Sequence, residues 1–89
     1  MTTLHLINRS ALLPQTLELT QAGDCIVLIE DAVVVPETDL TALQQASDSV
    51  TVYAIKEDLQ ARNLSTLAKV IDYQEMVELV LNYDKVITW

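Results

Sequence analysis

The sequence predicts an α/β fold: one domain, residues 1–89, with a mainly parallel sheet of about five strands and helices on both faces, giving three layers. Two observations lead to this class. Short runs of branched apolar residues alternate with segments that carry helix-capping residues, the order expected of repeated strand–helix–strand units. The run 25–29 is apolar at every position, as in a strand covered on both sides. With 89 residues, the chain has the length of a single domain.

The first part of the chain is expected to form two strands with a helix between them. Residues 3–8 are rich in branched side chains, and the polar turn at their end suits a helix start. A helix follows over about 11–20, with Pro14 in its first turn, where proline is tolerated. Gly23 ends this helix, and 25–29 forms the second strand, which we expect to be central.

The middle of the chain is expected to hold a connector, a helix and the third strand. Residues 31–35 form the connector, and 36–39 combine proline with acidic residues, which favours a helix N-terminus. Leu40 and Leu43 would lie on the buried side of that helix. The β-branched and aromatic residues over 50–55 predict the third strand.

Two helices and two short strands complete the predicted order. Residues 57–62 suit a short helix, after which Asn63 takes a left-handed conformation. Residues 70–71 form a brief fourth strand, the acid-x-x-Glu pattern at 72–75 begins the last helix, and 85–89 form the fifth strand. The apolar residues of the last helix repeat at helical spacing: Tyr73, Met76, Val77, Val80 and Leu81.

Charge and composition exclude several classes of protein. Thirteen acidic side chains against five basic ones give a net charge of -8, which disfavours direct nucleic-acid binding and favours partners with basic patches. A single glycine cannot build a phosphate-binding loop. No apolar run is long enough to span a membrane, and no basic flank precedes an apolar stretch near residue 1. We therefore expect no membrane segment, no export signal and a cytoplasmic protein.

Cys25 and His5 are each the only residue of their type, so the sequence predicts no internal disulfide, no metal site and no cofactor. Cys25 is the one strong nucleophile, and a persulfide on its sulfur is the catalytic alternative. The apolar run around Cys25, with no cation nearby in the sequence, favours a packed core thiol instead. His5 lies between two leucines and is expected to be a hydrogen-bonded structural residue.

Polar residues follow the first three predicted strands, at positions 8–10, 30–31 and 56–58. Ligands of open parallel sheets bind beyond the carboxyl ends of the strands, but any buried strand that reaches solvent also ends in polar residues. Both interpretations stand. On extended backbone, Glu30 and Asp31 would point to opposite faces, so they would not form the facing pair of carboxylates that acid–base catalysis uses.

Tyr83 and Trp89 are the candidate interface residues. A short chain that is 51% hydrophobic is expected to leave an apolar patch exposed, and such patches mark interfaces. Aromatic side chains concentrate in interface cores, although they also serve in protein cores. We expect an oligomer with partner proteins, and self-association when the chain is expressed alone.

Several segments resemble, in their order and spacing, those of one family. They are Leu4-His5 with Asn8-Arg9-Ser10, Leu28-Ile29-Glu30-Asp31-Ala32-Val33, Tyr53-Ala54-Ile55 with Asp58-Leu59-Gln60-Ala61-Arg62-Asn63-Leu64, Ile71-Asp72-Tyr73, Val77-Glu78-Leu79 and Trp89. The sequence resembles the TusB/DsrH family, the smallest subunits of the bacterial TusBCD and DsrEFH sulfur-relay complexes. The resemblance runs from end to end.

This resemblance implies a DsrE/F/H-type fold and a place in a heterohexamer with TusC/DsrF-like and TusD/DsrE-like subunits. Such complexes accept persulfide sulfur from small sulfur-carrier proteins and pass it onward. In the Tus case the sulfur goes toward thiolation of the tRNA wobble uridine, and in the Dsr case the complex serves sulfur oxidation. In the family, the principal sulfur-accepting cysteine belongs to the TusD/DsrE-type subunit.

The sequence departs from the family in two places. Residues 11–20 contain no cysteine, where some DsrH members carry one, and Ala32 stands where the family often has glycine. The resemblance therefore implies an accessory subunit of a TusBCD-like sulfurtransferase without a catalytic residue of its own. The alternatives are a DsrEFH-type subunit in sulfur oxidation, a persulfide carrier that uses Cys25, and a self-associating α/β protein unrelated to sulfur.

Overall fold

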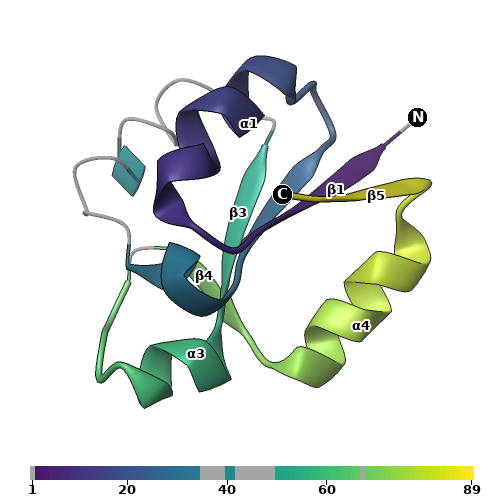
Figure 1. Cartoon of the computed structure of the whole chain (residues 1–89). Helices are drawn as coiled ribbons and strands as arrows, with labels where there is room; N and C mark the ends of the chain where they lie inside the picture. The colour runs from purple at the N-terminus through teal and green to yellow at the C-terminus, as the bar shows by residue number, and fades with distance from the viewer. Residues whose placement is uncertain (1, 35–39, 42–49, 67) are drawn as a thin grey trace.

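The computed structural model, which describes residues 2–34, 40–41, 50–66 and 68–89, confirms the predicted fold class (Figure 1). Its sheet has five strands in the order β4-β3-β2-β1-β5, and every neighbouring pair is parallel. β2 is the middle strand, as its apolar sequence predicts. The strands are β1 (Thr3–Ile7), β2 (Cys25–Leu28), β3 (Thr51–Ile55), β4 (Lys69–Ile71) and β5 (Lys85–Thr88).

The helices of the described residues fall between the strands. They are η1 (Ser10–Leu12) and α1 (Leu13–Leu19), η2 (Glu30–Val33), α3 (Lys56–Ala61) and α4 (Tyr73–Asn82), of which η1 and η2 are 3₁₀ helices. The predicted helix beginning at 36–39, with Leu43, lies outside the described residues, apart from Leu40 and Thr41, which are helical. None of the helices that the structure describes is long and apolar enough to cross a membrane.

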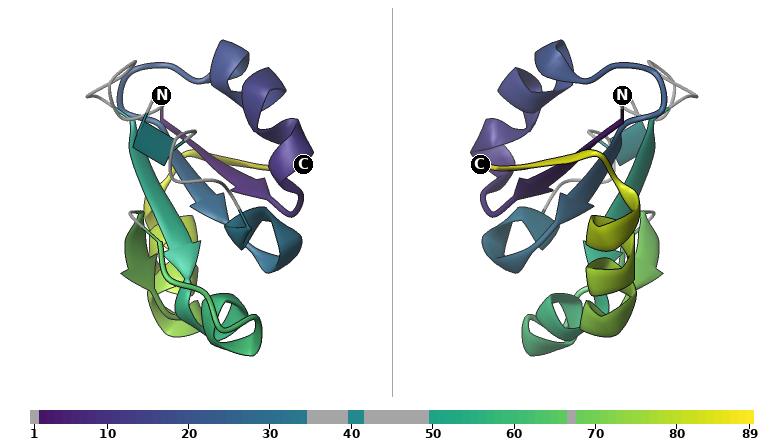
Figure 2. Two further views of the ribbon diagram at one scale, coloured as in Figure 1. Left: turned by 90° about the vertical axis from the view of Figure 1, so that its left-hand side faces the viewer. Right: turned by 90° about the vertical axis from the view of Figure 1, so that its right-hand side faces the viewer.

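The order of the strands decides which face each helix covers. The chain moves from β1 through β2 and β3 to β4 in one direction, and β5 then pairs with the other side of β1. Because parallel crossovers are right-handed, this reversal places α4 on the face opposite to the earlier helices. Figure 2 shows α1 and α4 on opposite sides of the sheet. We call these two sides the α1 face and the α4 face.

Each face of the sheet has its own core. The larger core lies on the α1 face, where Leu13, Leu40 and Leu59 bring their helices onto the strands. On the α4 face, Met76, Leu79 and Val80 pack on strand residues. The strand residues alternate between the faces along each strand, with Ile7, Ile26, Leu28, Val52 and Ala54 on the α1 face and Leu4, Cys25, Val27, Ile55 and Ile71 on the α4 face.

Local signals at the ends of the helices are confirmed. Gly23 has φ of 89° in the turn before β2, a left-handed conformation that glycine adopts without strain. Asn63, with φ of 52°, follows α3. At the start of α4, Asp72 Oδ1 accepts from the Glu75 N–H (2.8 Å) and Glu75 Oε1 accepts from the Asp72 N–H (3.2 Å), which completes the predicted capping box.

Two local expectations need correction. Residues 30–33 form the 3₁₀ helix η2, where the sequence predicts only a connector over 31–35. In α4, Met76 and Val80 pack on the sheet, but the other three apolar residues of the predicted stripe are exposed: Tyr73, Val77 and Leu81. Helical periodicity identifies an apolar sector, but it does not tell how much of that sector the sheet covers.

Candidate functional site

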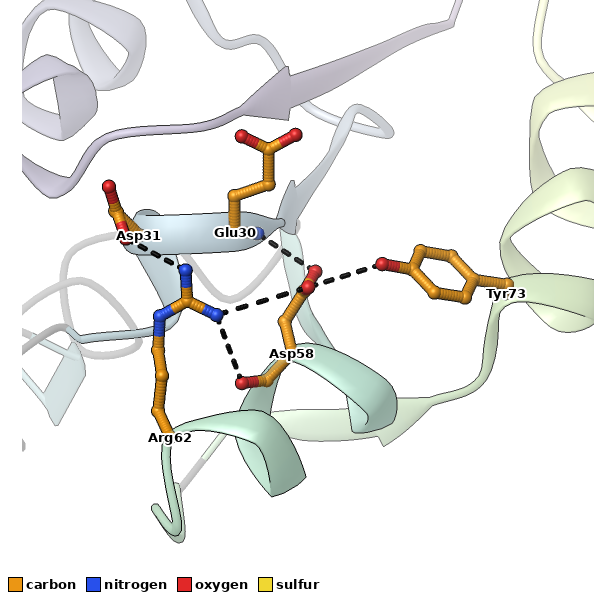
Figure 3. A network of polar contacts seen from close by, with 5 residues as sticks. All are labelled: Glu30, Asp31, Asp58, Arg62 and Tyr73. Carbon is orange, nitrogen blue, oxygen red and sulfur yellow. Dashed lines mark hydrogen bonds and ion pairs between the residues drawn. The ribbon is translucent and has the colours of Figure 1, made fainter.

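A network of polar side chains joins the carboxyl ends of β2 and β3 (Figure 3). Glu30 and Asp31 are the first residues of η2, Asp58 belongs to α3, Arg62 follows that helix, and Tyr73 begins α4. The elements meet here because the carboxyl ends of parallel strands share one edge of the sheet. We call these five residues the rim network.

Asp58 is the centre of the rim network, and it is only 9% exposed. Its Oδ2 accepts a hydrogen bond from the Glu30 backbone N–H (2.8 Å), and its Oδ1 accepts one from the Tyr73 hydroxyl (3.1 Å). One carboxylate therefore fastens η2, α3 and α4 to one another. Burial, together with the negative charge of Asp58, raises the pKa of Tyr73, so the hydroxyl keeps the proton that it donates.

Arg62 supplies the positive charge of the rim network. Its Nη2 donates to Asp31 Oδ1 (2.8 Å) and its Nη1 donates to the Asp58 carbonyl oxygen (3.2 Å), while Nη1 also lies 4.0 Å from Asp58 Oδ1. The Asp31 hydrogen bond is the main reason why the pKa of Arg62 is raised. Because these groups are solvated, the ion pairs of Arg62 add little to the stability of the fold. Their effect is to position the two loops.

Glu30 has an uncommon backbone, with φ of 51° in the left-handed region. Non-glycine residues adopt such angles at a cost of about 1–3 kcal/mol and often do so near functional sites. The Asp58 carboxylate supports this conformation by accepting the Glu30 N–H. The expectation that Glu30 and Asp31 lie on extended backbone is therefore wrong, because the chain turns into η2 at this point. The Glu30 carboxylate points away from the other four side chains (Figure 3).

The polar contacts of the rim network hold separate segments of the chain together. The Asp31 and Asp58 carboxylates each face a donor, and the Glu30 carboxylate points away from them, so the network shows no pair of carboxylates facing each other across a gap, as glycosidase-type catalysis requires. None of the five side chains is a Cys or Ser nucleophile. The sequence placed Glu30, Asp31 and Asp58 at this edge but missed Arg62 and Tyr73. The four-residue spacing of Asp58 and Arg62 is the one local signal that would have indicated their pairing.

Cys25, the candidate nucleophile, lies at the opposite end of the sheet, where β2 begins. Its side chain is fully buried in the core of the α4 face. Burial raises the pKa of the Cys25 thiol, and the negative charge of Asp24 adds to this, whereas a hydrogen bond with Tyr83 lowers it without reversing the shift. Because the thiolate is the nucleophilic form, both accessibility and charge oppose sulfur chemistry at Cys25 in the folded chain.

The two candidate interface residues take part in internal packing. Tyr83 packs against the core of the α4 face, and burial raises the pKa of its hydroxyl. Trp89 packs against the core of the α1 face, and its indole Nε1 donates to His5 Nδ1 (3.3 Å). Because Nδ1 accepts from Trp89, the other His5 nitrogen, Nε2, is the one that donates to Asp24 Oδ2, which lies 3.4 Å away. Contact of Tyr83 or Trp89 with another subunit stays a prediction.

Comparison with known proteins assigns the chain to a family. The sequence profile of the family described as "DsrH like protein" matches residues 8–86. The proteins named TusB from Salmonella arizonae and Salmonella newport are each 36% identical to this chain over 85% of both chains. The chain belongs to the TusB/DsrH family. This confirms the resemblance drawn from the sequence.

Most of the residues described above fall within the segment of this TusB/DsrH chain that matches the family. Residues 8–86 include the whole rim network, together with Cys25 and Tyr83. His5 and Trp89, which hydrogen bond to each other across β1 and β5, lie outside that span. The rim network and Cys25 are therefore part of the matched region.

Proposed function

We propose that this chain is an accessory subunit of a sulfur-relay complex and has no sulfur-accepting residue of its own. The observation that carries the proposal is membership of the TusB/DsrH family combined with burial of the single cysteine. The proposed complex is a heterohexamer in the cytoplasm that also contains TusC/DsrF-like and TusD/DsrE-like subunits and receives sulfur from carrier proteins. The relatives named TusB favour thiolation of the tRNA wobble uridine over sulfur oxidation.

The chemistry of a persulfide relay explains why Cys25 is a poor participant. The acceptor thiolate attacks the outer sulfur of the donor persulfide, a new S–S bond forms, the old one breaks, and the donor cysteine leaves as a thiolate. No external oxidant or reductant is consumed. An acceptor must therefore be ionised and within reach of another protein's cysteine. Cys25 is fully buried, and its pKa is raised.

Charge supports a protein-binding role. The chain has a net charge of -8, and nucleic-acid binding depends on Lys and Arg side chains that displace counterions from phosphates. An acidic chain instead attracts protein partners with basic surfaces. In the proposed complex, this subunit completes the assembly and offers docking surface, while another subunit carries the acceptor cysteine.

Co-expression with the TusC-like and TusD-like subunits of the same organism tests this proposal. Native mass spectrometry of the purified complex should show two copies of each of the three subunits. Deleting the gene should abolish 2-thiolation of the wobble uridine, and the wild-type gene should restore it. A chain that stays monomeric beside its co-expressed partners would refute the subunit role, and intact tRNA thiolation in the deletion strain would point to sulfur oxidation instead.

A further inference from the structure

α4 presents an apolar stripe to solvent. Tyr73, Val77 and Leu81 follow one another at four-residue spacing and are 44%, 53% and 79% exposed. Residues four apart lie on one face of a helix, so the three side chains form a continuous row. We call this row the α4 stripe. Solvent exposure of such a row is unusual in a folded protein, because amphipathic helices turn their apolar residues toward a core.

The α4 stripe lies on the flank of α4 that faces away from β4. The opposite flank, with Glu75, Glu78 and Asn82, lines a shallow depression together with Lys69 of β4 and Tyr53 of β3. Glu78 lies about 100° around the helix from Val77. The Tyr73 hydroxyl donates to Asp58 of α3, so the stripe begins beside the rim network.

The sheet face beneath that flank is only partly covered. Among the described residues, α4 is the one helix on this face, whereas η1, α1, η2 and α3 border the other. Five strands spaced about 4.8 Å apart span about 19 Å, whereas a helix with its side chains is only about 10 Å wide. One helix therefore covers about half of the width of the sheet. Leu6 and Ile29 on this face are half-buried. Val86 pairs with Leu4, so it lies on the same face, and it is 38% exposed.

The negative charge near the stripe indicates which kind of partner would bind there. α4 carries Glu75 and Glu78 and no Lys or Arg, and the whole chain has a net charge of -8. Glu78 borders the stripe, three residues before Leu81, so a second copy of this chain docked stripe to stripe would bring the two Glu78 carboxylates toward one another, which is unfavourable. A partner with an apolar centre and Lys or Arg side chains at its edge would bury the stripe and pair with the Glu78 carboxylate.

We propose that the α4 stripe, together with the partly covered α4 face of β1 and β5, is the docking surface for a neighbouring subunit of the relay complex whose contact surface is apolar at its centre and basic at its rim. This inference rests on the proposed function. It assigns assembly to α4 and not to the aromatic residue Trp89, whose indole is engaged with His5 inside the chain.

Paired variants of exposed residues test the docking surface with the co-expressed TusC-like and TusD-like subunits as the probe. Leu81→Asp on α4 is matched by Leu19→Asp on α1, because Leu19 is also exposed, at 59%, but lies on a helix of the α1 face. Glu78→Lys is matched by Glu18→Lys, an exposed position on α1. Circular dichroism of each isolated variant verifies that it folds. If Leu81→Asp does not fold, Glu78→Lys still tests the docking surface.

The expected result is that Leu81→Asp and Glu78→Lys weaken association at least tenfold, as loss of a central contact or of a complementary charge does, while both α1 variants associate like wild type. Association of the wild type should also weaken as salt concentration rises. If wild type and all four variants assemble equally, the docking surface is refuted and the subunit role stands. If the wild type does not assemble, the proposed function fails and this inference fails with it. If the chain self-associates through the stripe, and Leu81→Asp abolishes this self-association, the inference is also overturned.

Discussion

The Asp24 carboxylate is a buried charge that ties the start of β1 to the start of β2. It is 5% exposed and accepts hydrogen bonds from the backbone N–H groups of Thr3 and Gln21, both at 2.9 Å. Burial alone would raise the pKa of Asp24, but these bonds and the contact with His5 outweigh it, so the pKa is lowered.

We expect Asp24→Asn to lower the free energy of unfolding by about 1–3 kcal/mol at pH 7, because the amide replaces one acceptor with a donor. Urea denaturation measures this, and Glu18→Gln on the exposed side of α1 is the control. The folded-state pKa lies below the unfolded value of about 3.9, so the Asp24 contribution is full above that pH and is lost as the pH falls through the folded pKa. The acid limb of the stability curve should therefore be flatter in Asp24→Asn. An equal acid limb in both proteins would contradict the assignment.

Cys25 should be protected from thiol reagents while the chain is folded. Its side chain is fully buried and its pKa is raised, and both reduce the rate of alkylation. Iodoacetamide should modify the protein at least a hundredfold more slowly in buffer than in urea above the unfolding midpoint, as followed by mass spectrometry. Free cysteine in both solvents is the control for reagent reactivity. Rapid labelling of the native protein would mean that the core around Cys25 opens readily.

At the scale of elements, α4 has a well-defined start and an incompletely buried side. Asp72→Ala removes the side-chain half of the capping box, so we expect the free energy of unfolding to fall by about 1 kcal/mol. Asp72→Ser, which retains a capping oxygen, should recover most of the loss. Thermal or urea unfolding measures both variants. A full loss in Asp72→Ser would show that the charge, and not the hydrogen bond, stabilises the helix start.

β5 is an edge strand, and Trp89 fastens its end. Trp89→Phe keeps an aromatic ring but leaves His5 Nδ1 without its donor, so we expect the free energy of unfolding to fall by about 1–3 kcal/mol. Guanidinium denaturation followed by circular dichroism measures the change. Thr88→Ala, at the exposed end of the same strand, is the control. If both variants have the same stability, the His5–Trp89 hydrogen bond does not hold β5 in place.

The elements show what the sequence can and cannot predict. The all-apolar run of β2 and the capping residues of α4 are local signals, and they correctly place a central strand and a helix start. The rim network brings together residues from three separate segments, so no local pattern encodes the network as a whole, although the four-residue spacing of Asp58 and Arg62 indicates that one pair. The exposed α4 stripe was missed because periodicity reports which residues share a side, whereas coverage depends on the width of the sheet.

For the whole molecule, the reversal of strand order at β1 distributes the helices unequally between the two faces. The crossovers that follow β1, β2 and β3 share one face, and the crossover to β5 lies on the other. The described part of the α4 face therefore has one helix to cover five strands, and it leaves apolar side chains exposed. The proposed docking surface is part of this incompletely covered face, so binding of a neighbouring subunit there would bury the exposed apolar side chains.

In the proposed complex, this chain supports sulfur transfer without carrying sulfur itself. The direct measurement is transfer of ³⁵S from labelled cysteine, through a cysteine desulfurase and a carrier protein, to the TusD-like subunit of the reconstituted complex. We predict that Cys25→Ala transfers sulfur at the wild-type rate, that no label resides on this chain, and that omitting the chain reduces transfer. Stoichiometric label on Cys25, or loss of transfer in a folded and assembled Cys25→Ala complex, would contradict the account.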